Sequence, residues 1–95
     1  MLIVCGTVSV EQGRREAYLE EYLPRVESVR QEPGCVEYGM SPDPLDANRL
    51  RVFEQWASAE DLDRHLGSPR AHPAVPVVGA DIVVYEATET RRLAG

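Results

Sequence analysis

The spacing of hydrophobic positions changes early in the chain, which predicts a strand followed by a helix. Residues 2–10 are apolar and β-branched, so we expect a strand, with Gly6 at a bulge or a close approach. Over residues 11–32 apolar side chains recur every three or four positions, which predicts an amphipathic helix ending before a Pro-Gly pair. Pro24 removes one helical hydrogen bond, so we expect a kink or a local break there. The predicted apolar stripe is Tyr18, Leu19, Tyr22, Leu23, Val26 and Val29.

A hairpin and a second, shorter helix follow. Residues 35–41 and 49–56 have the composition of strands, and the sequence PDPLDAN between them favours a turn, so the two segments predict a β-hairpin. We expect the second helix at 59–66. Ser58 is a suitable N-cap, and Asp61, three residues later, resembles the acid of a capping box.

The last strand completes a β-α-β-β-α-β order. Pro73 and Pro76 prevent another long helix, and residues 81–88 predict the final strand. This order is typical of the α+β ferredoxin-like fold, a four-stranded antiparallel sheet with two helices on one face. We expect a single domain over residues 1–90 and a loose polar tail at 91–95.

The final strand also bears on assembly. Residues 82–85 (IVVY) are apolar on both faces, whereas a strand with one face in water should alternate. A domain this small has nothing left to cover the second face, which favours a homodimer. The alternative is a central strand with a tolerant outer face.

Composition and charge exclude several classes of function. The chain has 43% hydrophobic and 27% charged residues, as an ordinary folded protein does. Its 16 acids against 10 bases give a net charge of -6, which repels phosphate backbones, so we expect no nucleic-acid partner. All the bases are arginine, which excludes a catalytic lysine, a Schiff base and a Walker-type phosphate loop.

The sequence shows no pattern typical of a membrane segment, a signal peptide or a cysteine-based metal site. No apolar stretch approaches the roughly 18–20 residues that a membrane helix needs, so we expect no membrane partner. The first residues carry no basic segment and do not resemble a signal peptide, so we expect a soluble, cytoplasmic protein. Cys5 and Cys35 fit no zinc spacing and are expected to stay reduced.

His65 is the most informative candidate for chemistry. It lies on the second predicted helix, beside the apolar stripe of Leu62 and Leu66. A histidine that faces a cavity can act as a general base or a hydrogen-bond donor. The alternative is a structural histidine at the edge of the core, and spacing leaves both readings open.

Trp56, the only tryptophan, shares one face of its strand with Glu54, Val52 and Leu50. If that face meets the helices, Glu54 is a carboxylate against an apolar layer and therefore a candidate acid or base. The alternative is that Trp56 only fills the core, while Glu54 pairs with an arginine or lies at a solvated strand end.

The remaining candidates are weaker. Arg70 and His72 follow in a proline-rich loop, where they could line a pocket mouth or simply be exposed. Tyr38, like the tyrosines of the first helix, could hydrogen-bond a phenolic ligand or serve in packing. His65 and His72 have no third ligand in register, so we expect no metal site.

Three segments carry a resemblance to a known family. GCVEYGM (34–40), VFEQWAS (52–58) and HLGSP (65–69) together resemble the antibiotic biosynthesis monooxygenase domain family, over roughly residues 1–90. The resemblance implies a dimeric α+β barrel. The family includes small quinol monooxygenases, and its superfamily also contains haem-degrading enzymes, isomerases and proteins of unknown role.

The resemblance also implies a type of chemistry. Known members oxidise electron-rich phenols or quinols with dioxygen and use neither metal nor flavin, so it implies a small aromatic substrate and no cofactor. Removing a proton from such a substrate creates a delocalised carbanion, which can pass an electron to oxygen. By position, Trp56 would be the pocket tryptophan and His65 the helix histidine, with Tyr38 and Glu54 as polar residues near the substrate.

The chain departs from the family pattern at several positions. Val52 stands where antibiotic-tailoring members carry an asparagine that can hydrogen-bond a substrate oxygen. Arg70 stands where quinol-oxidising relatives often have a second histidine, and His72 lies two residues further on. The interval from Trp56 to His65 is one residue shorter than in haem-degrading relatives, which makes haem degradation the poorer prediction.

Three hypotheses therefore follow from the sequence. The first is a cofactor-independent monooxygenase acting on a quinol or polycyclic phenol, with His65 as acid or base. The second, motivated by Val52 and the missing second histidine, is a non-catalytic dimeric protein that binds a small aromatic ligand. The third is an isomerase that would use the same histidine for proton transfer without oxygen.

Overall fold

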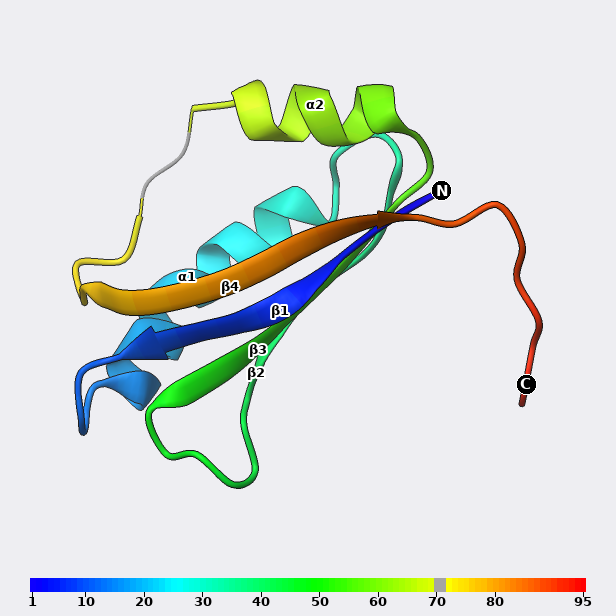
Figure 1. Ribbon diagram of the computed structural model, residues 1–95. Coiled ribbons are helices and arrows are strands. Elements are labelled where there is room, and N and C mark those ends of the chain that lie inside the picture. Colours follow the sequence, from blue (N-terminus) through cyan, green and yellow to red (C-terminus); the bar gives the residue numbers. More distant parts are fainter. Residues whose placement is uncertain (70–71) are drawn as a thin grey trace.

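The computed structural model describes residues 1–69 and 72–95, and it confirms the ferredoxin-like α+β fold (Figure 1). The sheet has the order β2-β3-β1-β4 with every neighbouring pair antiparallel, so β3 lies between β1 and β2. That placement is the split βαβ arrangement expected from the order of elements. The elements are β1 (Leu2–Val10), α1 (Arg15–Val29), β2 (Cys35–Pro42), β3 (Arg49–Trp56), α2 (Ala59–Gly67) and β4 (Val77–Glu86).

Helix α1 is shorter than the sequence predicts and is not broken at its proline. It begins at Arg15 rather than at residue 11, because the preceding residues form a turn in which Gly13 has a φ of 79°. The sequence predicts a kink or a local break at Pro24. The helix continues through this residue, so the second alternative, a break, is wrong. Pro24 is exposed, so water can hydrate the carbonyl that loses its helical partner.

Strand β4 begins four residues earlier than predicted, at Val77, and ends two residues earlier, at Glu86. The long strand β1 explains the early start, because it offers pairing partners as far as Val10, which aligns with Val77. Gly6 is a point of close approach between these two strands. A side-chain carbon added there would lie 1.9 Å from the carbonyl oxygen of Asp81, so only glycine fits.

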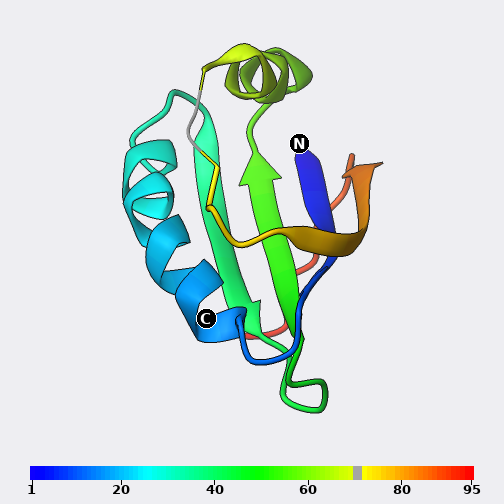
Figure 2. The same ribbon diagram turned by 90° about the vertical axis from the view of Figure 1, so that its left-hand side faces the viewer.

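The two helices cover only part of the sheet. α1 packs mainly against β2 and α2 against β3, and Figure 2 shows α1 along one side of the sheet and α2 above one end. The core lies between these elements and is centred on Trp56, Tyr38 and Leu50, which are at most 1% exposed. Two members of the predicted helical stripes are not in the core: Leu23 is 57% exposed and Leu66 54%.

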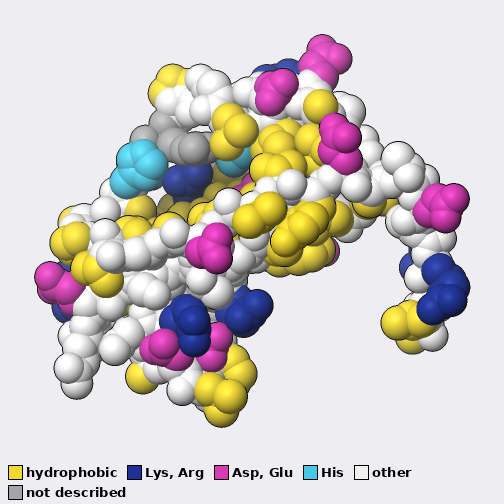
Figure 3. All heavy atoms as spheres, in the orientation of Figure 1, with side chains coloured by type: hydrophobic (Ala, Val, Ile, Leu, Met, Phe, Trp, Pro, Cys, Tyr) yellow, Lys and Arg dark blue, Asp and Glu magenta, His cyan; other side chains and the backbone are white. Residues whose placement is uncertain are grey.

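β4 is exposed along its whole length, although most of its side chains are apolar. Figure 3 shows hydrophobic side chains gathered over this part of the surface. After β4, residues 87–95 form no helix or strand and extend away from the sheet (Figure 1). None of the helices within residues 1–69 and 72–95 is long and apolar enough to cross a membrane.

The start of α2 is fixed as the sequence predicts. The Ser58 side chain accepts a hydrogen bond from the backbone N–H of Asp61 at 3.2 Å, and its hydroxyl donates to the Asp61 carboxylate at 2.8 Å. The bond that the Ser58 hydroxyl donates holds the pKa of the Asp61 carboxyl below its usual range, and Arg64 lowers it further. Because the cap sets where α2 begins, it also sets which helical positions face the sheet.

Candidate functional site

The inner face of β3 forms the floor of the site. Leu50, Val52, Glu54 and Trp56 all lie on the face that meets the helices, as their alternation predicts. A cavity of about 300 Å³ lies over this face, between the sheet and both helices. The cavity is lined by Val4, Val8, Tyr18, Tyr22, Arg25, Tyr38, Met40, Val52, Glu54, Leu62, His65, Leu66, Ile82 and Val84.

His65 lies between the helices and the sheet and is only 3% exposed. Its ring stacks on Trp56 at a centroid distance of 4.7 Å, and it meets the Tyr38 ring edge-on at 5.6 Å. Its Nδ1 nitrogen lies 3.0 and 3.2 Å from the two carboxylate oxygens of Glu32 and donates to them. The packing and this bond fix the imidazole plane and place the Nδ1 proton.

Glu32 is a site residue that sequence analysis missed. It lies just beyond the end of α1, thirty-three positions before His65, and its side chain is 26% exposed. Its position before Pro33 suggested only a helix end. Nothing local to either residue indicates the pair, because the contact depends on how α1 and α2 pack.

The Glu54 side chain faces inward, and its carboxylate is hydrogen-bonded. The indole N–H of Trp56 donates to its carboxylate at 3.0 Å. Trp56 therefore has a polar partner for its buried nitrogen, which a tryptophan with no exposed surface requires. Glu54 is half-buried and lines the cavity, but no arginine within residues 1–69 and 72–95 pairs with it.

Three tyrosines form a second polar element in the cavity wall. Their rings stack in the order Tyr18, Tyr22 and Tyr38, with centroid distances of 5.8 and 6.3 Å. The hydroxyls of Tyr22 and Tyr38 are hydrogen-bonded to each other. Burial, and then the bond to Tyr22, raises the pKa of Tyr38 far above its usual value, so its phenol stays protonated.

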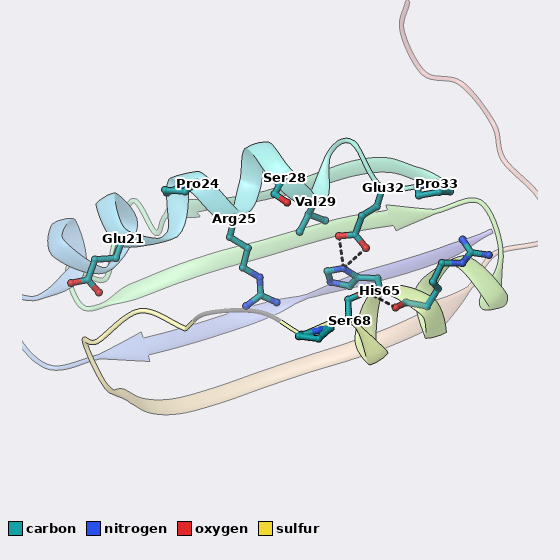
Figure 4. A pocket seen from close by; sticks show the side chains of 11 residues that line it. Glu21, Pro24, Arg25, Ser28, Val29, Glu32, Pro33, His65 and Ser68 are labelled. Carbon is teal, nitrogen blue, oxygen red and sulfur yellow. Dashed lines mark hydrogen bonds and ion pairs between the residues drawn. The ribbon is translucent and has the colours of Figure 1, made fainter.

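A second hollow, a cleft of about 550 Å³, opens between the two helices (Figure 4). It shares two residues with the cavity, Arg25 and His65, which therefore stand where the two spaces meet. In Figure 4 the Arg25 side chain reaches from α1 into the cleft, and Glu32 meets His65 from the end of the same helix. The cleft is lined by Glu21, Pro24, Arg25, Ser28, Val29, Glu32, Pro33, Arg64, His65, Ser68 and Pro69.

The other predicted site residues fall into three groups. Val52 is buried and lines the cavity, so that position of the floor has no hydrogen-bonding group. His72 is exposed and lines neither the cavity nor the cleft, and Arg70 lies outside the described residues. Among residues 1–69 and 72–95, no three His, Cys, Asp or Glu side chains are grouped to hold a metal ion, and Cys5 and Cys35 are unpaired.

Comparisons with known proteins agree on the fold. A candidate antibiotic biosynthesis monooxygenase from Deinococcus radiodurans superposes with a TM-score of 0.87 at 26% identity, over all of both chains. The haem degrader MhuD of Mycobacterium tuberculosis superposes with a TM-score of 0.69, over 97% of this chain and all of that one. At 17% identity, it shows the shared fold alone.

Two curated proteins are similar to the chain in sequence. The chain is 29% identical over 98 aligned positions to the uncharacterised protein sll1783 of Synechocystis, covering 97% of this chain and 67% of that protein. It is 27% identical to the Escherichia coli protein named "Probable quinol monooxygenase YgiN", covering 87% and 89% of the two chains. The family model "Antibiotic biosynthesis monooxygenase" matches residues 1–76, and the chain therefore belongs to the antibiotic biosynthesis monooxygenase family.

Proposed function

We propose that the protein is a cofactor-independent monooxygenase that oxidises a quinol or polycyclic phenol with dioxygen. The observation that carries this proposal is the contact between His65 and Glu32 at the edge of an aromatic-walled cavity. A histidine held by a carboxylate can accept a proton and remain stabilised as an imidazolium. The name of the 27% identical YgiN protein points to the same substrate class.

The chemistry can be balanced without a cofactor, as an anthrone illustrates. His65 takes one benzylic proton, and the carbanion that remains is oxidised by dioxygen. One oxygen atom becomes the new carbonyl, and the other leaves as water with the two benzylic hydrogens. Tyr38, protonated at neutral pH, would donate to the oxyanion that develops on the substrate. Val52 would exclude water, and Trp56 would support the His65 ring from below.

We also propose that the protein acts as a homodimer in which β4 lies against a second copy. β4 supplies Ile82 and Val84 to the cavity wall, yet these residues are 46% and 51% exposed in the single chain. On the opposite face of the strand, Val83 and Tyr85 are 42% and 54% exposed. A partner over this strand would close the cavity as well as cover apolar surface.

A second candidate function is favoured by Val52. The floor of the cavity has an apolar side chain where tailoring members of the family carry an asparagine, so one hydrogen bond to a substrate oxygen is missing. A protein with that floor could bind a small aromatic ligand without turning it over. An isomerase is the third possibility, and it would differ by working without oxygen.

The test is oxygen uptake by metal-stripped protein with a panel of quinols and anthrones. We expect uptake above the autoxidation rate, and we expect His65→Gln to lower it by about a hundredfold. His72→Gln is the matched control, because that histidine is exposed and outside both hollows. Uptake that His65→Gln leaves unchanged would remove His65 from the mechanism. Tight binding with no product would support the binding protein, and anaerobic turnover the isomerase.

A further inference from the structure

Arg25 is a half-buried cation with no acidic partner in the part of the chain that the structure describes. Its Nε nitrogen is buried and makes no hydrogen bond within residues 1–69 and 72–95. The guanidinium lies 5.3 Å from the centre of the Tyr22 ring. A cation–π contact of this kind holds the side chain in place but leaves its N–H donors available.

The lack of a partner is unexpected in this sequence. Glu21 precedes Arg25 by one helical turn, a spacing at which a carboxylate and an arginine commonly pair. Instead, the Glu21 carboxylate accepts a hydrogen bond from the backbone N–H of Ala74 at 2.7 Å. The acid one turn before Arg25 is therefore engaged elsewhere.

The other charges around Arg25 are already engaged. Glu32 accepts from His65, and Glu54 accepts from Trp56. Arg64, the other arginine of the cleft, lies 2.8 Å from Asp61 and 3.8 Å from Glu60. Within the described residues, Arg25 is therefore the one charged group lining either hollow that has neither an ion pair nor a hydrogen bond.

The position of Arg25 suits a ligand that occupies both hollows. It lines the aromatic cavity on one side and the helix cleft on the other, next to His65 (Figure 4). A ring placed over Val52 and beside Tyr38, which line the same cavity as Arg25, would bring a substituent on that ring toward the guanidinium. Partial burial strengthens a charged hydrogen bond there, because water competes less well than it does at the surface.

We propose that Arg25 binds the anionic substituent of the substrate and that the substrate class is therefore a hydroxylated aromatic carboxylate. The planar guanidinium matches a carboxylate through two parallel hydrogen bonds. This inference rests on the proposed function, because it takes the bound ligand to be the substrate. Its test uses a redox-inert pair of ligands, so that it can succeed or fail independently of oxygen chemistry.

The experiment is calorimetric titration of the full chain with 3-hydroxy-2-naphthoate and with 2-naphthol, which differ by the carboxylate. We expect the naphthoate to bind about tenfold more tightly than the naphthol. Arg25→Met, which keeps an apolar stem but removes the charge, should abolish that difference. Arg25→Lys should restore part of it, since a lysine keeps the charge but not the paired geometry.

Arg64→Met is the matched control, because it removes an arginine from the same cleft that already has two carboxylate partners. It should change the preference by less than about threefold. Equal affinity of the wild-type protein for both ligands would overturn the proposal, as would failure of the naphthoate to bind. So would an Arg25→Met variant that loses both ligands equally, since that result would indicate a purely structural arginine. Oxygen uptake with uncharged quinols tests the proposed function independently of these binding results.

Discussion

Strands β3 and β4 flank the same central strand, yet one is buried on its inner face and the other is exposed. The inner residues of β3, Leu50, Val52 and Trp56, are at most 6% exposed, whereas Ile82 and Val84 of β4 are about half exposed. Both strands are rich in apolar residues. The difference comes from the helices, which pack over β2 and β3 and leave β4 uncovered.

This comparison shows that the single chain completes only one side of its own cavity. On the β3 side, Trp56, His65 and Glu32 are fixed by packing and hydrogen bonds. On the β4 side, the wall is a row of apolar side chains open to solvent. The β3 side fixes the position of the candidate acid–base group. The β4 side is where the proposed second copy of the chain would pack.

The largest expected effect is on stability and concerns the buried β3 side of the molecule. Trp56→Ala should lower the free energy of unfolding by about 3–5 kcal/mol, since it empties a fully buried site and orphans Glu54. Urea denaturation at two protein concentrations measures this cost, which should be the same at both. A loss below about 1 kcal/mol would mean that the β3 side is not the rigid part of the molecule.

The next largest effect is on self-association and concerns the exposed strand β4. Val83→Arg places a charge on the outer face of β4, so it should convert the proposed dimer to single chains in sedimentation velocity. The stability of the wild-type protein should rise with protein concentration, by about 2 kcal/mol over the accessible range, and the variant should lose this dependence. A wild-type protein that sediments as a single chain at every concentration would contradict the dimer.

A smaller effect separates positioning from packing in the site. Glu32→Gln keeps the shape of the side chain but removes the charge that stabilises a protonated His65, so oxygen uptake should fall about tenfold. The midpoint of urea unfolding should hardly move. Glu60→Gln, which alters an exposed acid at 3.8 Å from Arg64, is the control. Equal activity of the two variants would show that Glu32 does not position the histidine.

The smallest effect concerns the β2–β3 turn, which belongs to the covered half. Hydrogen bonds from the backbone of Leu45 and Asp46, together with Arg49 and Arg51, lower the pKa of Asp43. A lowered folded-state pKa means that this carboxylate stabilises the fold above its unfolded pKa, and the contribution is lost as pH falls through the folded value. Asp43→Asn should therefore flatten the acid limb of a stability–pH curve and leave β4 unaffected. An unchanged acid limb would contradict this assignment.

Much of the fold was predictable because local signals agree with the packing. The N-cap Ser58, the alternation on β3 and the turn residues of the hairpin each specified one element, and the structure has them there. The errors have non-local causes. Val77 pairs because β1 is long enough to reach it, and α1 continues through Pro24 because that position faces solvent.

The candidate site was only partly predictable for the same reason. Trp56, Val52 and Tyr38 were found by strand periodicity and by family resemblance. Val52 and Tyr38 line the cavity, whereas Trp56 is fully buried against the His65 ring. Glu32 and Arg25 were missed, because their importance comes from what α1 brings beside α2 and the sheet. The spacing of residues along the chain does not indicate that Glu32 meets His65 or that Arg25 lines the cavity.

The most direct test of the account is oxygen-18 labelling of the product during anthrone oxidation under labelled dioxygen. We predict one labelled oxygen atom in the new carbonyl, one in water, no hydrogen peroxide, and loss of the reaction in His65→Gln. Release of peroxide with the same product at the same rate in both proteins would indicate autoxidation, and it would contradict an oxygenase built around His65.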